Sequence, residues 1–196
     1  MGKGRLEAFT DGVVAIIITI MVLELHVPQD KSLAALRTGV PVFLAYILSY
    51  LNVGIFWNNH HHMLHASERV NGKVLWANLA LLFWLSLVPF GIRWIDEQGL
   101  TALPVAFYGI VLTGAAISYN VLAHLLIEVN GHDSKLARAL GHDRKGKLSM
   151  ALYVIAIGVA FLWPWLSMAI YIAVALVWLI PDTRIEALIK SGTSPI

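Results

Sequence analysis

Apolar runs long enough to cross a lipid bilayer recur along the whole chain. A membrane-spanning helix needs about 20 predominantly apolar residues, and these runs are too long and too uniformly apolar for the strands of a membrane barrel. Polar, charged or proline-containing segments separate them. The pattern predicts six transmembrane helices, at residues 6–26, 38–59, 74–95, 102–128, 147–163 and 165–181.

The composition agrees with this pattern, and no linker interrupts it. Of the 196 residues, 58% are apolar and 13% are charged, whereas a soluble domain carries about 25% charge. We therefore expect an all-α integral membrane protein with a single six-helix domain, residues 1–196. The absence of cysteine excludes disulfides and thiolate metal sites. The net charge of +2 gives no indication of a nucleic-acid partner.

The positive charges are distributed unevenly between the two sides of the predicted membrane domain. Most lysines and arginines fall in loops on the side of the N-terminus, and the other side receives Lys31, Arg37 and Arg93. Loops rich in lysine and arginine stay in the cytoplasm. The distribution predicts that the N-terminus and the C-terminus are both cytoplasmic, which agrees with an even number of spans.

The first predicted helix has two different sides. At about 100° per residue, Ile16, Ile20 and Leu23 form one stripe, with Thr19 beside them. Asp11 precedes Ile16 by five positions and therefore points about 140° away from it. The sequence thus separates an apolar side from a side that carries a carboxylate.

A carboxylate inside a membrane is costly and normally finds a partner. The second predicted helix offers Trp57, Asn58 and His61 at the same depth, so we expect hydrogen bonds between Asp11 and these residues. A carboxylate that only caps the start of the first helix is a second interpretation, and a proton-relay or ion-binding role is a third. Glu24, near the outer end, either attracts cations to that end or is a buried partner in a pair, and the sequence favours neither role.

A cluster of histidines follows the second predicted helix, from His60 to Glu68. His61 and His65 are one helical turn apart, and with Glu68 they form a possible three-ligand metal set. The alternative function is therefore a metal-binding membrane enzyme, or a metal or proton transporter. Histidines that lie at the membrane interface without binding metal are the simpler interpretation. No catalytic Ser–His–Asp order or phosphate-binding glycine loop is evident, so we expect neither an enzyme nor a bound metal.

The stretch RLEAFTDGVVAI, residues 5–16, is followed by VLEL at residues 22–25 and by Pro28. It resembles the first helix of the transmembrane protein 175 family of potassium channels, whose signature is arginine, three further residues, and Phe-Ser-Asp. Thr10 stands where the family usually has serine. Both residues supply a hydroxyl that is able to bond to backbone near a helix start.

The resemblance implies a potassium-preferring cation channel with no cofactor, in which K⁺ is the permeant ion. It also implies a homotetramer in the lipid bilayer of a prokaryotic cell membrane, with the first helix of each subunit lining the pore and monovalent cations passing through it. The constriction would fall at Ile16, and further pore-facing layers at Thr19, Ile20 and Leu23. The residues expected to anchor the helix are Arg5, Phe9, Thr10, Asp11, Trp57, Asn58 and His61.

Overall fold

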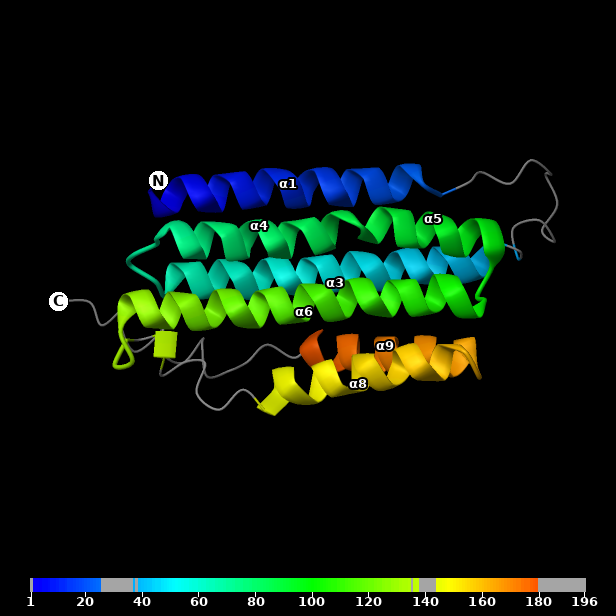
Figure 1. Ribbon diagram of the computed structural model, residues 1–196. Coiled ribbons are helices and arrows are strands. Elements are labelled where there is room, and N and C mark those ends of the chain that lie inside the picture. The colour runs from blue at the N-terminus through cyan, green and yellow to red at the C-terminus, as the bar shows by residue number, and fades with distance from the viewer. Residues whose placement is uncertain (1, 26–36, 38, 135, 138–143, 180–196) are drawn as a thin grey trace.

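The computed structural model describes residues 2–25, 37, 39–134, 136–137 and 144–179, and these residues form an all-helical bundle (Figure 1). The prediction of an all-α fold is confirmed. The helices of the described part are α1 (Lys3–Leu23), α3 (Val40–His65), α4 (Gly72–Ser86), α5 (Val88–Gln98), α6 (Ala102–Asn130), α8 (Arg144–Ala160) and α9 (Pro164–Leu179).

The first helix begins earlier than the sequence predicts, at Lys3 rather than at residue 6. Gly2, in an extended conformation, is the residue before the helix, and no side chain caps this end. Asp11 therefore lies about two turns inside the helix. The interpretation of Asp11 as a helix cap is wrong, because the backbone N–H groups that a cap satisfies belong to the first turn.

The third predicted span is two helices rather than one. α4 ends at Ser86 and α5 begins at Val88, with Leu87 between them. Pro89, in the first turn of α5, has no N–H to donate, and its ring would clash with the carbonyl of Leu85 in a continuous helix. The Leu87 N–H donates instead to the carbonyl of Trp84, at 3.2 Å. The proline thus breaks the rod and leaves its two halves roughly in line (Figure 1).

Four segments of the described chain are long and apolar enough to cross a membrane: α1, α3, the α4–α5 rod Gly72–Gln98, and α6. α9 is apolar but has 16 residues. Such a helix is about 24 Å long, shorter than the hydrocarbon core of about 30 Å. The segment 26–36 and the end of the sixth predicted span lie outside the described residues. The cytoplasmic location of the termini stays a prediction.

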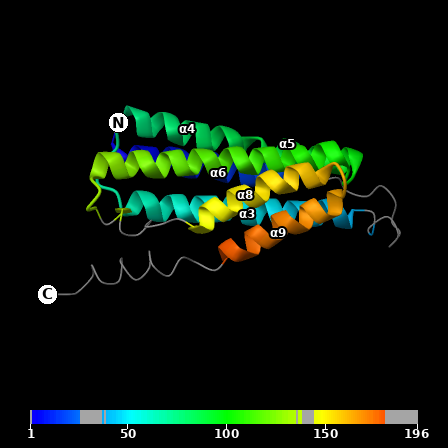
Figure 2. The same cartoon turned by 60° about the horizontal axis from the view of Figure 1, so that its bottom comes forward.

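α1 lies at one edge of the bundle, against α3, α4 and α5 (Figure 1). The α8–α9 hairpin lies at the other side and packs against α6 and α3 (Figure 2). α6 runs between these two sides and contacts α4, α5, α8 and α9. Because α1 packs against the bundle from one side, the described helices leave its other side uncovered.

Glycines on α6 allow its neighbours to approach closely. The indole ring of Trp84, from α4, occupies the space that a Cβ at Gly114 would fill. The hydroxyl of Tyr171, from α9, lies where a Cβ at Gly109 would be. Small residues permit such close contact between membrane helices, where van der Waals packing supplies much of the association energy.

Candidate functional site

α1 presents a buried face to the rest of the bundle. Buried residues recur every third or fourth position along it, the period of one helix face. Their apolar members belong to the same hydrophobic core as residues of α3, α4 and α5. The buried residues of α1 are Leu6, Thr10, Val14, Ile17 and Met21.

The opposite face of α1 is open. The exposed fraction of Ile16 is 58%, whereas that of its neighbour Ile17 is 3%. Ile20 and Leu23 are exposed as well, and Leu23 reaches 80%. The Thr19 side chain is also exposed, and its hydroxyl donates to the carbonyl of Ile16 at 2.9 Å. This bond satisfies the Thr19 proton and leaves the hydroxyl oxygen able to accept from another group.

The carboxylate of Asp11 is held by the second long helix. The indole Nε1 of Trp57, on α3, donates to Oδ1 of Asp11 at 2.7 Å. The Trp57 ring stacks on the ring of His61, with 6.0 Å between ring centroids. Asp11, Trp57 and Asn58 line a groove between α1 and α3. Arg5 is exposed and forms no ion pair with Asp11 in the described part of the chain.

A second connection, which is buried, joins α1 to α4 and α3. The Nδ2 of Asn78, on α4, donates to the hydroxyl oxygen of Thr10 at 2.9 Å. The Oδ1 of Asn78 lies 2.7 Å from Nε2 of His60 on α3. Because Oδ1 can only accept, Nε2 of His60 carries the proton. The exposed fractions of these three residues are 3% or less, so the chain of hydrogen bonds joins three helices inside the core.

Asn78 and His60 are site residues that sequence reasoning missed. Asn78 is a lone polar residue in an apolar run, and such residues often form hydrogen bonds across membrane helices. The position of Asn78 in the sequence could therefore have indicated a hydrogen bond between helices. His60 was masked by its neighbours in the histidine run, because only the rotation of α3 determines which histidine is buried.

Phe9 does not pack into the core of its own chain, since 47% of its surface is exposed. At the other end of α1, Glu24 forms an ion pair. Nη1 of Arg93, on α5, lies 3.4 Å from Oε2 of Glu24, and Nε of Arg93 lies 2.9 Å from Oε1 of Glu97. Glu24 therefore takes part in an ion pair, but the pair is not buried, because the Arg93 side chain is 54% exposed and that of Glu24 is 22% exposed.

The histidine cluster contains an ordered pair, but the proposed metal triad is not assembled. The rings of His61 and His65 stack with 6.2 Å between centroids, as expected one turn apart. Glu68 lies beyond the end of α3, where its N–H donates to Oδ1 of Asn130 at 2.8 Å. Among the described residues, no group of three histidine or acidic side chains is arranged to hold a metal ion.

A family model matches the part of the chain that contains this site. Residues 5–89 match the family described as endosomal/lysosomal potassium channel TMEM175. The matched segment includes α3, α4 and nearly all of α1, and therefore every residue of the two connections that hold α1.

Similar proteins extend the match to nearly the whole chain. A potassium channel of Chryseobacterium sp. is 52% identical over 192 residues, which are 98% of this chain and 100% of that protein. A potassium channel of Streptomyces collinus is 30% identical, over 89% of this chain and 90% of that protein. The human endosomal/lysosomal proton channel TMEM175 is 36% identical over 96 residues, which are 42% of this chain and 19% of the human protein.

The fold agrees with a solved structure. The crystal structure of a lysosomal potassium-selective channel TMEM175 homolog from Chamaesiphon minutus superposes with a TM-score of 0.79. The two chains are 26% identical, and the superposition covers 92% of this chain and 97% of that one. The relatives are named as channels and not as enzymes. With a full-length relative at 52% identity, the chain belongs to the TMEM175 family of potassium channels.

Proposed function

We propose that four copies of this chain form a potassium-preferring channel whose central pore is lined by α1 of each copy. The observation that carries the proposal is the two-sided character of α1. One side is fixed to α3 and α4 through Asp11 and Thr10, and the side that bears Ile16 is uncovered.

An uncovered apolar face of a membrane helix can also face lipid. Exposure alone therefore does not distinguish a pore-lining face from a lipid-facing one. Gly12 and Thr19 are exposed on the same face as Ile16, which makes this face less uniformly apolar than a lipid-facing one. The two hydrogen-bonded connections lie on other sides of the helix. Functional sites require their residues to be held in a fixed orientation. The bonds from Trp57 to Asp11 and from Asn78 to Thr10 hold α1 in one orientation and leave the face that bears Ile16 free.

In the proposed pore, Ile16 forms the narrowest ring. Four isoleucine side chains around an axis exclude water when they are close together, and hydrophobic constrictions gate by losing their water. A small rotation or shift of α1 widens the ring. From Ile16 to Leu23, the residues span about 10 Å along the axis, so Thr19, Ile20 and Leu23 add further layers to one short constricted region.

The proposed selectivity is modest. A ring of Thr19 hydroxyl oxygens offers ligands to a partly dehydrated cation, but it does not form the cage of backbone carbonyls that replaces a full hydration shell in other potassium channels. Asp11 does not take part in conduction, because its carboxylate is engaged by Trp57. K⁺ is therefore the permeant ion and not a bound cofactor.

The proposed location is the cell membrane of a prokaryote. The relatives that match this chain over most of its length come from bacterial species, and the described part of the chain has four segments suited to crossing a lipid bilayer. The partners of the chain are then three further copies of itself, the surrounding lipid and monovalent cations.

Potassium flux into liposomes tests this function. Replacement of Ile16 by asparagine, a polar residue, should keep the constriction hydrated and raise the flux several-fold. Val22 provides a matched control, because it is 49% exposed but points about 120° away from Ile16. Val22→Asn should leave the flux near that of the unmodified protein. Equal effects of the two substitutions would contradict the assignment of Ile16 to the pore.

A second candidate is proton conduction. It is favoured by the name of the human relative, a proton channel, which shares 36% identity over 96 residues. Recordings in which K⁺ is replaced by a large impermeant cation distinguish the two. A current that disappears on replacement supports potassium conduction, and a current that persists and follows the pH gradient supports protons.

A further inference from the structure

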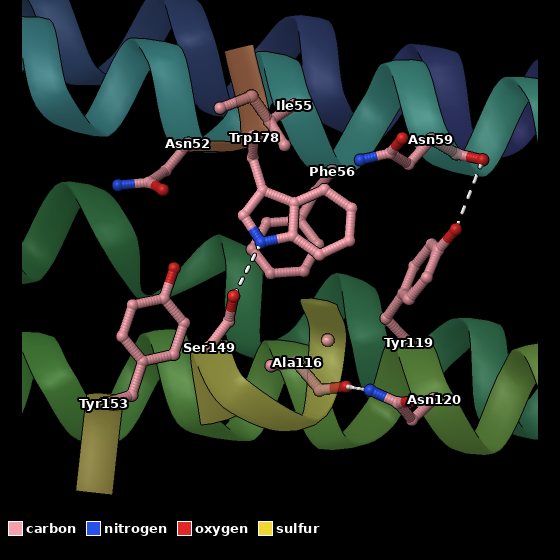
Figure 3. Close-up of a pocket in the computed structure, with 11 residues that line it drawn as sticks. Asn52, Ile55, Phe56, Asn59, Ala116, Tyr119, Asn120, Ser149, Tyr153 and Trp178 are labelled. Carbon is pink, nitrogen blue, oxygen red and sulfur yellow. Dashed lines mark hydrogen bonds between the residues drawn. The ribbon is translucent and has the colours of Figure 1, made fainter. Parts of the chain in front are cut away.

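A small, partly open cavity lies between α3, α6, α8 and α9 (Figure 3). Its volume is about 40 Å³. None of its lining residues belongs to α1, so it is separate from the exposed face described above. Most of the lining surface is apolar, from Ile55, Phe56, Ala116 and aromatic rings, and a smaller part comes from amide and hydroxyl groups.

Some polar groups of the lining are satisfied by the protein itself. The indole Nε1 of Trp178, on α9, donates to the hydroxyl oxygen of Ser149 on α8 at 2.8 Å. The Ser149 hydroxyl in turn donates to the carbonyl of Lys145 at 2.8 Å. These bonds close one side of the cavity and join the two helices of the hairpin.

Other polar groups of the lining are not satisfied in this way. The exposed fraction of Tyr153 is 4%, and its hydroxyl points toward Asn52 (Figure 3). No hydrogen bond to this hydroxyl is formed by the residues that the structure describes. Asn52 uses Nδ2 to donate to the hydroxyl of Tyr108 at 3.4 Å, which leaves its Oδ1 as an acceptor. No side-chain nitrogen or oxygen that is fully buried in the described part of the chain lacks a hydrogen-bond partner. The Tyr153 hydroxyl is therefore open to the cavity, where it can form a hydrogen bond with a molecule that enters.

Charge and size restrict what the cavity binds. Among the residues that the structure describes, none of the lining side chains is an aspartate, glutamate, lysine or arginine, and a buried ion needs an opposite charge. The ammonium of Lys145 lies 4.5 Å from the centre of the Trp178 ring and disfavours a further cation. A water molecule needs about 10–15 Å³ of cavity volume. The cavity therefore has room for roughly three water molecules.

We propose that this cavity is a binding site for small uncharged molecules with hydrogen-bonding groups, and that water occupies it when no other ligand is present. Water bridges the Tyr153 hydroxyl of α8 to Oδ1 of Asn52 on α3. The site thereby connects the α8–α9 hairpin to the long helices of the bundle. The proposed binding site does not depend on where the ions pass, so it can be tested separately from the proposed pore.

Thiol chemistry tests whether the cavity is hydrated. The chain has no cysteine, so a single introduced thiol reports on one position without a background. Asn59 lines the cavity, and Asn59→Cys should react with methyl methanethiosulfonate, a small neutral reagent. The reaction requires the thiolate, which forms in water and is suppressed in apolar surroundings. Mass spectrometry of the intact protein measures the rate.

Ala123→Cys is the matched control, since Ala123 is 6% exposed on α6 and does not line the cavity. We expect Asn59→Cys to react at least about ten-fold faster than Ala123→Cys. Ala116→Leu, introduced together with Asn59→Cys, places a larger apolar side chain in the cavity and should slow the reaction. Equal rates at positions 59 and 123, or no slowing by Ala116→Leu, would overturn the proposal.

A high-resolution density map of the unmodified protein gives a measurement that needs no variant. We expect density for ordered water within hydrogen-bonding distance of both the Tyr153 hydroxyl and Oδ1 of Asn52. A cavity without such density would contradict the proposal.

Discussion

Two consecutive side chains determine how α1 is held. Thr10 and Asp11 point about 100° apart on the helix, and each has a partner on a different helix. Thr10 accepts from Asn78 on α4, and Asp11 accepts from Trp57 on α3. Two bonds in different directions fix both the position of the helix and its rotation. The rotation is what presents Ile16 away from the core.

Substitution of Thr10 tests the buried connection. Thr10→Val keeps the shape but removes the acceptor, which leaves Nδ2 of Asn78 unpaired in the core. The loss of a buried partner costs about 1–3 kcal/mol, so the free energy of unfolding in detergent should fall by that amount. Thr10→Ser keeps the hydroxyl and is the control, with a smaller loss. Equal stability of the valine variant and the unmodified protein would contradict the role of this bond.

The sequence predicted part of this site. It predicted that Asp11 would be bonded to the end of the second helix, because an intramembrane carboxylate needs a donor and few were available at that depth. It did not predict the bonds of Asn78 and His60. The partners of a polar residue inside an apolar run depend on how each helix is rotated, and the hydrophobic pattern of a helix that is apolar all round does not fix that rotation.

At the scale of the elements, the break between α4 and α5 was not predicted, although Pro89 was visible. Membrane helices tolerate proline when other groups satisfy the freed backbone, so a proline alone does not distinguish a kink from a break. The break has a structural consequence. Arg93, on α5, pairs with Glu24 just after α1, so the C-terminal end of α1 is attached to α5, the second helix of the broken span.

The contact between α4 and α6 depends on Gly114. Gly114→Ala places a Cβ into the ring of Trp84, and overpacking of this kind costs about 1–3 kcal/mol. We expect a lower melting temperature in detergent. Gly158→Ala, on α8, is the matched control because a Cβ there meets no atom within 4 Å. The control should be neutral or stabilising by about 0.5–1 kcal/mol. Similar melting temperatures for the two variants would argue against tight α4–α6 packing.

At the scale of the whole molecule, the sequence predicted the helical class and the order of the rods. Long apolar runs are a strong signal because the bilayer requires both length and internally satisfied backbone. The ends of the helices were less predictable. The second span continues to His65, because a helix does not have to end where the apolar run ends.

The uncovered face of α1 also leads to a prediction about the assembly of the whole molecule. The open face of α1 forms a pore when several copies surround an axis, and four copies are proposed. Native mass spectrometry of the purified protein should give a complex of four times the chain mass of 21.6 kDa. A stable monomer or dimer under conditions that support potassium flux would contradict a tetrameric pore.

The most direct test of the central claim compares two neighbouring positions of α1. Ile16 is 58% exposed and Ile17 is 3% exposed, and the chain has no cysteine of its own. A charged thiosulfonate reagent is applied to Ile16→Cys and to Ile17→Cys while the potassium current is recorded. Modification at position 16 should block most of the current, and the same treatment at position 17 should leave it unchanged. An unaltered current after confirmed modification of position 16 would show that α1 does not line the pore in the way proposed.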